Sequence, residues 1–228
     1  MRLHRLWRVD LHCHTWFSPD GLSAPEAVIA MARRRGLDRL AITDHNTIAG
    51  ALEAQRLAPD LIIVGEEIKT DRGELLAYFV REEIPKGTPV DEALAWLREQ
   101  GAVVSVSHPF DRYRRSSALD EATLLDIVDR VDAIEVFNSR CIWPADNQQA
   151  AALAGRFRLP GTAGSDAHAA MEVGQAGLEM RPFDDAESFR AALTTAKVFG
   201  RLSHPGVHAF SVYARWLNIF RQRPVASS

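Results

Sequence analysis

Short apolar runs alternate with amphipathic stretches of helical length along the whole sequence, and this order most constrains the fold. Strands are predicted at 6–12, 37–43, 61–68, 73–80, 102–108, 131–138, 160–166 and 197–201. Helices are predicted at 23–36, 47–58, 89–101, 120–130, 144–157, 184–195 and 211–223. Strands that alternate with helices in this way predict βαβ units and a mostly parallel sheet.

The length decides between the possible α/β architectures. Six or seven strand–helix units in the first 200 or so of 228 residues fit a small α/β barrel better than an open sheet. A dinucleotide-binding open sheet would carry G-x-G-x-x-G after an early strand, and the sequence has none. We therefore expect one barrel domain over residues 1–205, with a C-terminal helix and tail, residues 206–228, packed on it.

Charge and cysteine content exclude some classes of protein. The formal net charge of −3 disfavours a broadly basic surface for long duplex nucleic acid. Cys13 and Cys141 form no C-x-x-C motif, so a disulfide scaffold is not expected. The first ten residues resemble no signal peptide, and no run of 18 apolar residues occurs, so we expect a cytoplasmic protein without membrane contact.

Histidines and carboxylates follow the predicted strands. His12 and His14 end the first strand, where side chains two residues apart share a face and Cys13 points the other way. Five of the eight histidines occupy such strand ends, and loop or core roles for all five are the alternative. The carboxyl ends of parallel strands meet at one end of a barrel, where metal ligands can converge. The other residues at predicted strand ends are Asp44, His45, Glu66, Glu67, His108, Asp166 and His168, while Glu74 begins a strand.

The ordered motifs "DLHCHTWFSPDG", "AITDHNT", "VGEEIKT", "SHPF" and "GSDAH" resemble the PHP (polymerase and histidinol phosphatase) family of metal-dependent phosphoesterases. The resemblance spans roughly residues 8 to 205 and implies a distorted (β/α)7 barrel with a centre of two or three divalent ions (Mn, Zn or Fe, with Mg possible). The ligands that it implies are His12, His14, Asp20, His45, Glu67, Glu74, His108, Asp166 and His168.

One position departs from that family pattern. Many relatives have histidine where this chain has Glu74, in "ELLAY". A carboxylate ligand favours Mn²⁺, Mg²⁺ or Fe²⁺ over Zn²⁺. An ordinary carboxylate at the start of a strand is the other interpretation of Glu74, and the sequence leaves both open.

The resemblance implies hydrolysis of phosphate esters by metal-activated hydroxide, with Asp166, Glu67 and His168 as catalytic residues. Four carboxylates and three divalent ions leave a net charge of about +2, which attracts a phosphate dianion. We expect a small phosphomonoester, a nucleotide or a short oligonucleotide end as substrate. The sequence predicts no oligomeric state.

Arginines beside the predicted strand ends are candidates for phosphate contacts, although arginine-rich loops are often merely solvated. Arg112 and Arg140 are the leading candidates, and Arg114 and Arg115 lie in the same "DRYRR" loop. Glu135 and Asn138 are candidates either to support a ligand or to contact substrate, and His204 is a candidate for a substrate contact or a structural role. Asp44 is expected to orient a ligand.

Two other functions remain open. An amidohydrolase-type barrel also begins with H-x-H but uses a bridging lysine, for which the chain offers only Lys69, Lys86 and Lys197. A non-catalytic metal-binding PHP domain is the second alternative. Against it, every expected ligand position carries a side chain that can bind metal.

Overall fold

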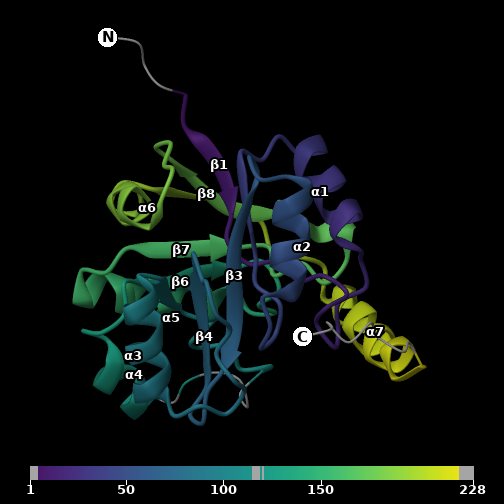
Figure 1. Cartoon of the computed structure of the whole chain (residues 1–228). Coiled ribbons are helices and arrows are strands. Elements are labelled where there is room, and N and C mark those ends of the chain that lie inside the picture. Colours follow the sequence, from purple (N-terminus) through teal and green to yellow (C-terminus); the bar gives the residue numbers. More distant parts are fainter. Residues whose placement is uncertain (1–4, 115–118, 120, 221–228) are drawn as a thin grey trace.

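The computed structural model describes residues 5–114, 119 and 121–220 and arranges them as one α/β domain (Figure 1). The strands of this described part form one sheet in the order β7-β6-β5-β4-β3-β2-β1-β8-β9. Their bounds are β1 Trp7–Asp10, β2 Arg39–Ile42, β3 Ile62–Lys69, β4 Glu74–Tyr78, β5 Val103–Val106, β6 Ala133–Asn138, β7 Gly161–Gly164, β8 Ala176–Met180 and β9 Lys197–Gly200. The helices are α1 Pro25–Arg34, α2 Ala49–Leu57, α3 Val90–Gln100, α4 Glu121–Ile127, α5 Pro144–Phe157, α6 Ala186–Leu193 and α7 His208–Phe220, with 3₁₀ turns η1 Ala170–Glu172 and η2 Pro205–Val207.

The sheet is mixed, so the expectation of a mostly parallel sheet was wrong. The pairs β1–β2, β2–β3, β5–β6 and β6–β7 are parallel, whereas β3–β4, β4–β5, β1–β8 and β8–β9 are antiparallel. Residues 70–73 join β3 to β4, and so short a link permits only a hairpin. The strand β8 was not predicted, because Ala176 and Gly177 give it little strand propensity.

β7, at one end of the strand order, meets the residues that follow β1 and nearly closes the sheet into a barrel. The Leu11 amide donates to the Ala163 carbonyl at 3.3 Å, and the Asp166 amide donates to the His12 carbonyl at 2.7 Å. Gly164 permits this approach, since a Cβ atom there would lie 2.4 Å from the Cβ of His12. Closure therefore brings the first and last predicted ligand motifs side by side.

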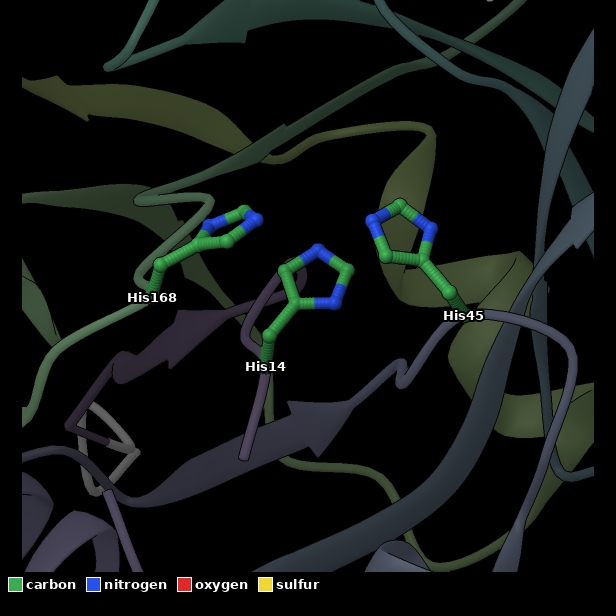
Figure 2. A group of neighbouring side chains, drawn as sticks. All are labelled: His14, His45 and His168. Atoms are coloured by element: carbon green, nitrogen blue, oxygen red, sulfur yellow. The ribbon is translucent and has the colours of Figure 1, made fainter. Parts of the chain in front are cut away.

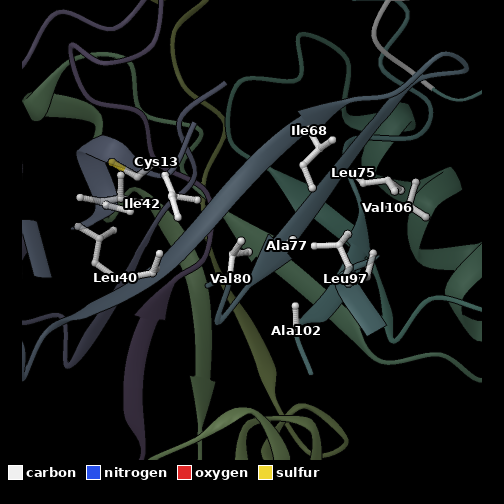
Figure 3. Packing of buried hydrophobic residues seen from close by; sticks show 14 of the residues in the cluster. Cys13, Leu40, Ile42, Ile68, Leu75, Ala77, Val80, Leu97, Ala102 and Val106 are labelled. Atoms are coloured by element: carbon white, nitrogen blue, oxygen red, sulfur yellow. The ribbon is translucent and has the colours of Figure 1, made fainter. Parts of the chain in front are cut away.

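Two apolar clusters pack against the two faces of the sheet. The outer cluster packs the sheet against α1, α2, α3, α4 and α5, and Figure 3 shows part of it around β3 and β4. The inner cluster fills the barrel with one face of the strands, and α6 adds Phe189, Ala192 and Leu193 to it. Leu11 belongs to the inner cluster and Cys13 to the outer one, so the alternation of faces shifts between them. This shift turns His12 and His14 inward.

The helix predicted at 211–223 corresponds to α7, whose Ser211 and Ala214 are buried. Residues 221–228 of the predicted tail lie outside the described residues. Among the helices that the structure describes, none has the length and apolar character needed to cross a membrane.

Candidate metal centre

The predicted ligands converge at the end of the barrel where β1, β2 and β3 finish. His12 and His14 follow β1, His45 follows β2, and Glu67 lies in β3. His108 follows β5, whereas Asp166 and His168 follow β7. Glu74 begins its strand yet lies at the same end, because β4 runs antiparallel to β3 and pairs Glu74 with Lys69. The hairpin thus explains how a residue at a strand start joins residues at strand ends.

Three overlapping groups of side chains could each hold an ion. They are His14, His45 and His168; His12, His14 and Glu67; and Glu67, Glu74 and His108. Within each group the ligand atoms lie within 4.8 Å of one another. Figure 2 shows the three imidazoles of the first group turned toward a common space. Because neighbouring groups share His14 or Glu67, they form one continuous centre.

Two aspartates complete the arrangement. Asp166 Oδ1 lies 3.3 Å from His14 Nε2 and 3.6 Å from His12 Nε2. Asp20 Oδ1 lies 3.5 Å from His45 Nε2 and 3.4 Å from His168 Nε2. All nine predicted ligands therefore lie together.

The histidine tautomers suit cation binding. Ser18 Oγ donates to Asp44 Oδ1, so it must accept from His14 Nδ1 at 3.0 Å. The Nδ1 atom of His12 donates to Glu135 Oε1 at 3.0 Å. In the neutral rings both Nε2 atoms therefore carry lone pairs, yet they lie 3.1 Å apart. A proton shared between them or a bound cation would relieve that repulsion.

Unpartnered oxygens support the same conclusion. Within the described residues, Asp20 Oδ1, Glu67 Oε2 and Asp166 Oδ1 are buried and accept no hydrogen bond. Buried carboxylate oxygens are costly unless a hydrogen bond or a cation compensates them. Imidazole nitrogens and carboxylate oxygens together are ligands for Zn²⁺, Mn²⁺ or Fe²⁺, so the residues present fit divalent ions.

Supporting residues hold these ligands by hydrogen bonds. Glu135 also accepts from the His108 amide at 2.9 Å, and Asn138 Nδ2 donates to Asp166 Oδ2 at 3.0 Å. Asn138 therefore positions a predicted ligand. The prediction that Asp44 orients a ligand agrees with its contact to Ser18.

Ser18 and Glu172 also support the ligands, and sequence reasoning missed both. The Glu172 carboxylate accepts from the His168 amide at 3.2 Å. Ser18 lies within the motif "DLHCHTWFSPDG", where nothing distinguished it from an ordinary loop residue, and Glu172 lies in none of the quoted motifs.

The electrostatics of the centre are strongly perturbed. Burial alone would raise the pKa of Asp166, but Arg114 and His12 outweigh burial and hold that pKa well below its usual range. Burial lowers the pKa of His14, yet the nearby Asp166 and Glu67 carboxylates outweigh burial and raise it to about 9. Burial and the Arg140 charge lower the pKa of His168 to about 3, which keeps this imidazole neutral. Neutral imidazole is the form that binds metal.

Two predicted ligands have strained backbone, as do Phe79 and Arg158 elsewhere in the described chain. His108 and Asp166 adopt positive φ angles of 22° and 52°, and Asn46, next to His45, adopts 55°. Such conformations are uncommon for residues other than glycine and cluster at functional sites. At His108 and Asp166 the strained backbone directs a ligand away from the strand that precedes it.

A basic cavity of about 760 Å³ adjoins the ligands. It is lined by His45, Asp20, Glu74 and His168 together with the basic residues Lys69, Lys86, Arg114, Arg140, His208 and Arg215. Arg114 forms an ion pair with Asp166 and is held by Asp111 Oδ2 at 2.8 Å. Arg140 is buried at the cavity wall.

Three predicted substrate residues do not line this cavity: Arg112, His204 and Asn138. Asn138 instead contacts Asp166. Arg112 is exposed, its Nε donates to Asp146 Oδ1 at 2.8 Å, and its guanidinium stacks on Trp143. Arg112 points away from the ligands because it pairs with the buried carboxylate of Asp146. His204 is exposed and accepts from the Gly206 amide. Arg115 lies outside the described residues.

Comparison with known proteins agrees with the geometry. The family model described as "PHP domain" matches residues 10–125, and the "PHP-associated" model matches residues 144–198. An uncharacterised protein of Methanocaldococcus jannaschii is 36% identical over 174 residues, which cover 74% of this chain and 68% of that protein. A second one from the same organism is 33% identical over 145 residues, which cover 58% of this chain and 82% of that protein.

More distant similarities extend the comparison. A protein of Haemophilus influenzae named 5'-3' exoribonuclease is 36% identical over 103 residues, 42% of this chain and 37% of that protein. The fold is similar to a two-domain Bacteroides vulgatus protein containing a predicted PHP-like metal-dependent phosphoesterase. That likeness has a TM-score of 0.70 and 19% identity, and it covers 92% of this chain and 70% of that one. On the matched models and the first relative, the chain belongs to the PHP domain family.

Proposed function

We propose that this protein is a metal-dependent phosphoesterase that hydrolyses small phosphomonoesters, nucleotides or short oligonucleotide ends. The observation that carries the proposal is the set of three ligand groups joined through His14 and Glu67. Two or three divalent ions held so close together lower the pKa of a coordinated water and neutralise phosphate oxygens.

The chain's own residues have distinct parts in this proposal. His12, His14, Asp20, His45, Glu67, Glu74, His108, Asp166 and His168 would hold the ions. Glu67 belongs to two of the three groups, so it would join neighbouring ions. His168 lines the cavity, Asp166 pairs with Arg114 at its wall, and the two would position the attacking water and the scissile ester.

Arg114 is the strongest candidate for a phosphate contact. Its guanidinium already pairs with Asp166, and Asp111 fixes its direction. Divalent ions at Asp166 would compete for that carboxylate and leave the guanidinium able to bind phosphate oxygens. The relative named 5'-3' exoribonuclease supports a phosphate ester as substrate class.

The cavity and the charge limit the substrate. A volume of about 760 Å³ suits a nucleotide-sized molecule. The net charge of −3 supplies no general attraction for duplex DNA, whose binding depends on many phosphate contacts. We therefore expect turnover at phosphate ends rather than within a long duplex.

The test compares substrates under identical Mn²⁺ and salt. A nucleoside monophosphate, a 5′-phosphorylated dinucleotide, a long duplex and a cyclic amide are incubated with the protein, and released phosphate, nucleotide and carboxylate are quantified. We expect turnover of the first two. Cutting only within the duplex would refute the substrate class, and turnover of the amide alone would favour an amidohydrolase.

Arg114→Ala should lower kcat/KM. The fall should correspond to a rise of about 1.5–3 kcal/mol in the activation free energy, the contribution of a hydrogen bond to a charged group. Arg33→Ala is a matched control, because Arg33 pairs with Asp60 where both side chains are exposed. Equal kcat/KM values for the two variants would remove Arg114 from the proposal.

A further inference from the structure

The C-terminal helix α7 faces the cavity although it lies outside the matched family models, which cover residues 10–125 and 144–198. Four of its residues line the cavity: His208, Ser211, Val212 and Arg215. Their spacing of three and four residues places them on one face of the helix. The helix therefore adds a wall to the site that the family matches do not cover.

A buried arginine links α7 to one predicted ligand. Arg140 donates from Nη1 to Ser211 Oγ at 2.9 Å and from Nη2 to the Val207 carbonyl at 2.8 Å. Its Nε lies 3.3 Å from Glu172 Oε2. Because Glu172 also accepts from the His168 amide, Arg140 connects the start of α7 to the loop that carries His168.

A second arginine, within α7 itself, contacts another predicted ligand directly. Arg215 Nη2 donates to Asp20 Oδ2 at 2.9 Å. The other oxygen, Oδ1, is buried without a hydrogen bond and points between His45 and His168. A carboxylate held through one oxygen presents its second oxygen in a fixed direction, here toward the group of His14, His45 and His168.

We infer that Arg215 is a positioning residue for metal binding: it orients Asp20 toward the ion held by His14, His45 and His168, so that α7 completes one part of the centre. Hydrogen-bond partners of metal ligands typically change metal affinity 10- to 100-fold when they are removed. Among the described residues, the side chains of the other two groups make no hydrogen bond or ion pair with α7, so their ions should be unaffected.

The inference rests on the proposed function only for its effect on hydrolysis. Its main test is a measurement of metal binding, which does not require hydrolysis. Calorimetric titration with Mn²⁺ is performed on the metal-stripped wild type, Arg215→Ala, Arg215→Lys and the control Arg33→Ala. We expect one class of Mn²⁺ site in Arg215→Ala to weaken by 10- to 100-fold, with the remaining sites unchanged. Arg215→Lys should recover part of the loss, because an ammonium can also donate to Asp20.

The possible outcomes separate this inference from the proposed function. Unchanged Mn²⁺ affinities in a folded Arg215→Ala protein would overturn it, as would an equal loss in Arg33→Ala. If circular dichroism shows Arg215→Ala to be unfolded, Arg215→Gln provides the same comparison with a side chain that still fills the space. Weakened Mn²⁺ binding in a protein that hydrolyses no phosphate ester would keep the inference and reject the function.

Discussion

At the scale of single residues, the centre depends on side chains that contribute ligand atoms rather than packing. Asp166→Ala and His14→Ala should each lower hydrolysis by more than about 100-fold, since losing a ligand should exceed the effect of losing a ligand's partner. Both variants should keep a folded circular dichroism spectrum, measured beside the exposed-carboxylate control Asp60→Ala. Near wild-type turnover at saturating Mn²⁺ in either variant would contradict the ligand assignment.

Glu66 lies on the face of β3 opposite Glu67 and should make the stability of the protein depend on pH. Burial raises its pKa from 4.5 to about 8, against the effect of the Ile84 amide that donates to it. The folded protein therefore favours the protonated acid. The free energy of unfolding is therefore highest below pH 4.5, where Glu66 is protonated in both states. It falls by roughly 3–5 kcal/mol as the pH rises from about 4.5 to 8.

Glu66→Gln should remove this dependence. Urea unfolding with EDTA present should give similar stabilities for the two proteins at pH 5 and a more stable variant at pH 9. A variant that loses stability equally at both pH values would show instead that the carboxylate is needed for its hydrogen bond.

At the scale of elements, closure of the barrel depends on the contact between β7 and the residues after β1. Gly164→Ala would place a Cβ atom 2.4 Å from the Cβ of His12 and 2.6 Å from its amide nitrogen. Because the backbone must move to accommodate this atom, we expect the free energy of unfolding to fall by about 1–3 kcal/mol, as for other overpacked cores. Mn²⁺ affinity should fall as well, because His12 and Asp166 would separate. Gly155→Ala is the control, because a Cβ atom there meets nothing within 4 Å. Gly36→Ala would not serve, since Gly36 has a φ of 66°.

The sequence predicted most elements and the residues that gather as candidate ligands, but not how the strands are directed. Apolar runs and helix periodicity report burial, so they located β1 through β7, β9 and the helices, and the motifs pointed to Glu67 and Asp166. Strand direction depends on the length of links such as 70–73, so the antiparallel β4 that brings Glu74 to the site was not foreseen. Arg112 was preferred over Arg114 because the loop sequence contains no sign of the buried Asp146 that binds it.

At the scale of the whole molecule, the ligands form a buried group of charges that ions would stabilise. Ligands that bind only the folded state raise its stability, by about 2.7 kcal/mol at one hundred times the dissociation constant. The melting temperature should therefore rise with Mn²⁺ and fall with EDTA, as measured by differential scanning fluorimetry. The shift should shrink in His14→Ala but persist in Asp60→Ala, and an unchanged melting temperature in the wild type would argue against a metal centre.

The hairpin of β3 and β4 also bears on the order of events during folding. Glu67 and Glu74 are joined by a short local turn, whereas His12 and Asp166 come from opposite ends of the barrel. Contacts between residues distant in sequence carry the larger loop-closure entropy and form more slowly. Refolding monitored by stopped-flow should therefore show secondary structure before Mn²⁺ uptake, with the last ion taken up in the slowest phase. A newly made chain would then complete its centre only after β7 has joined the residues that follow β1.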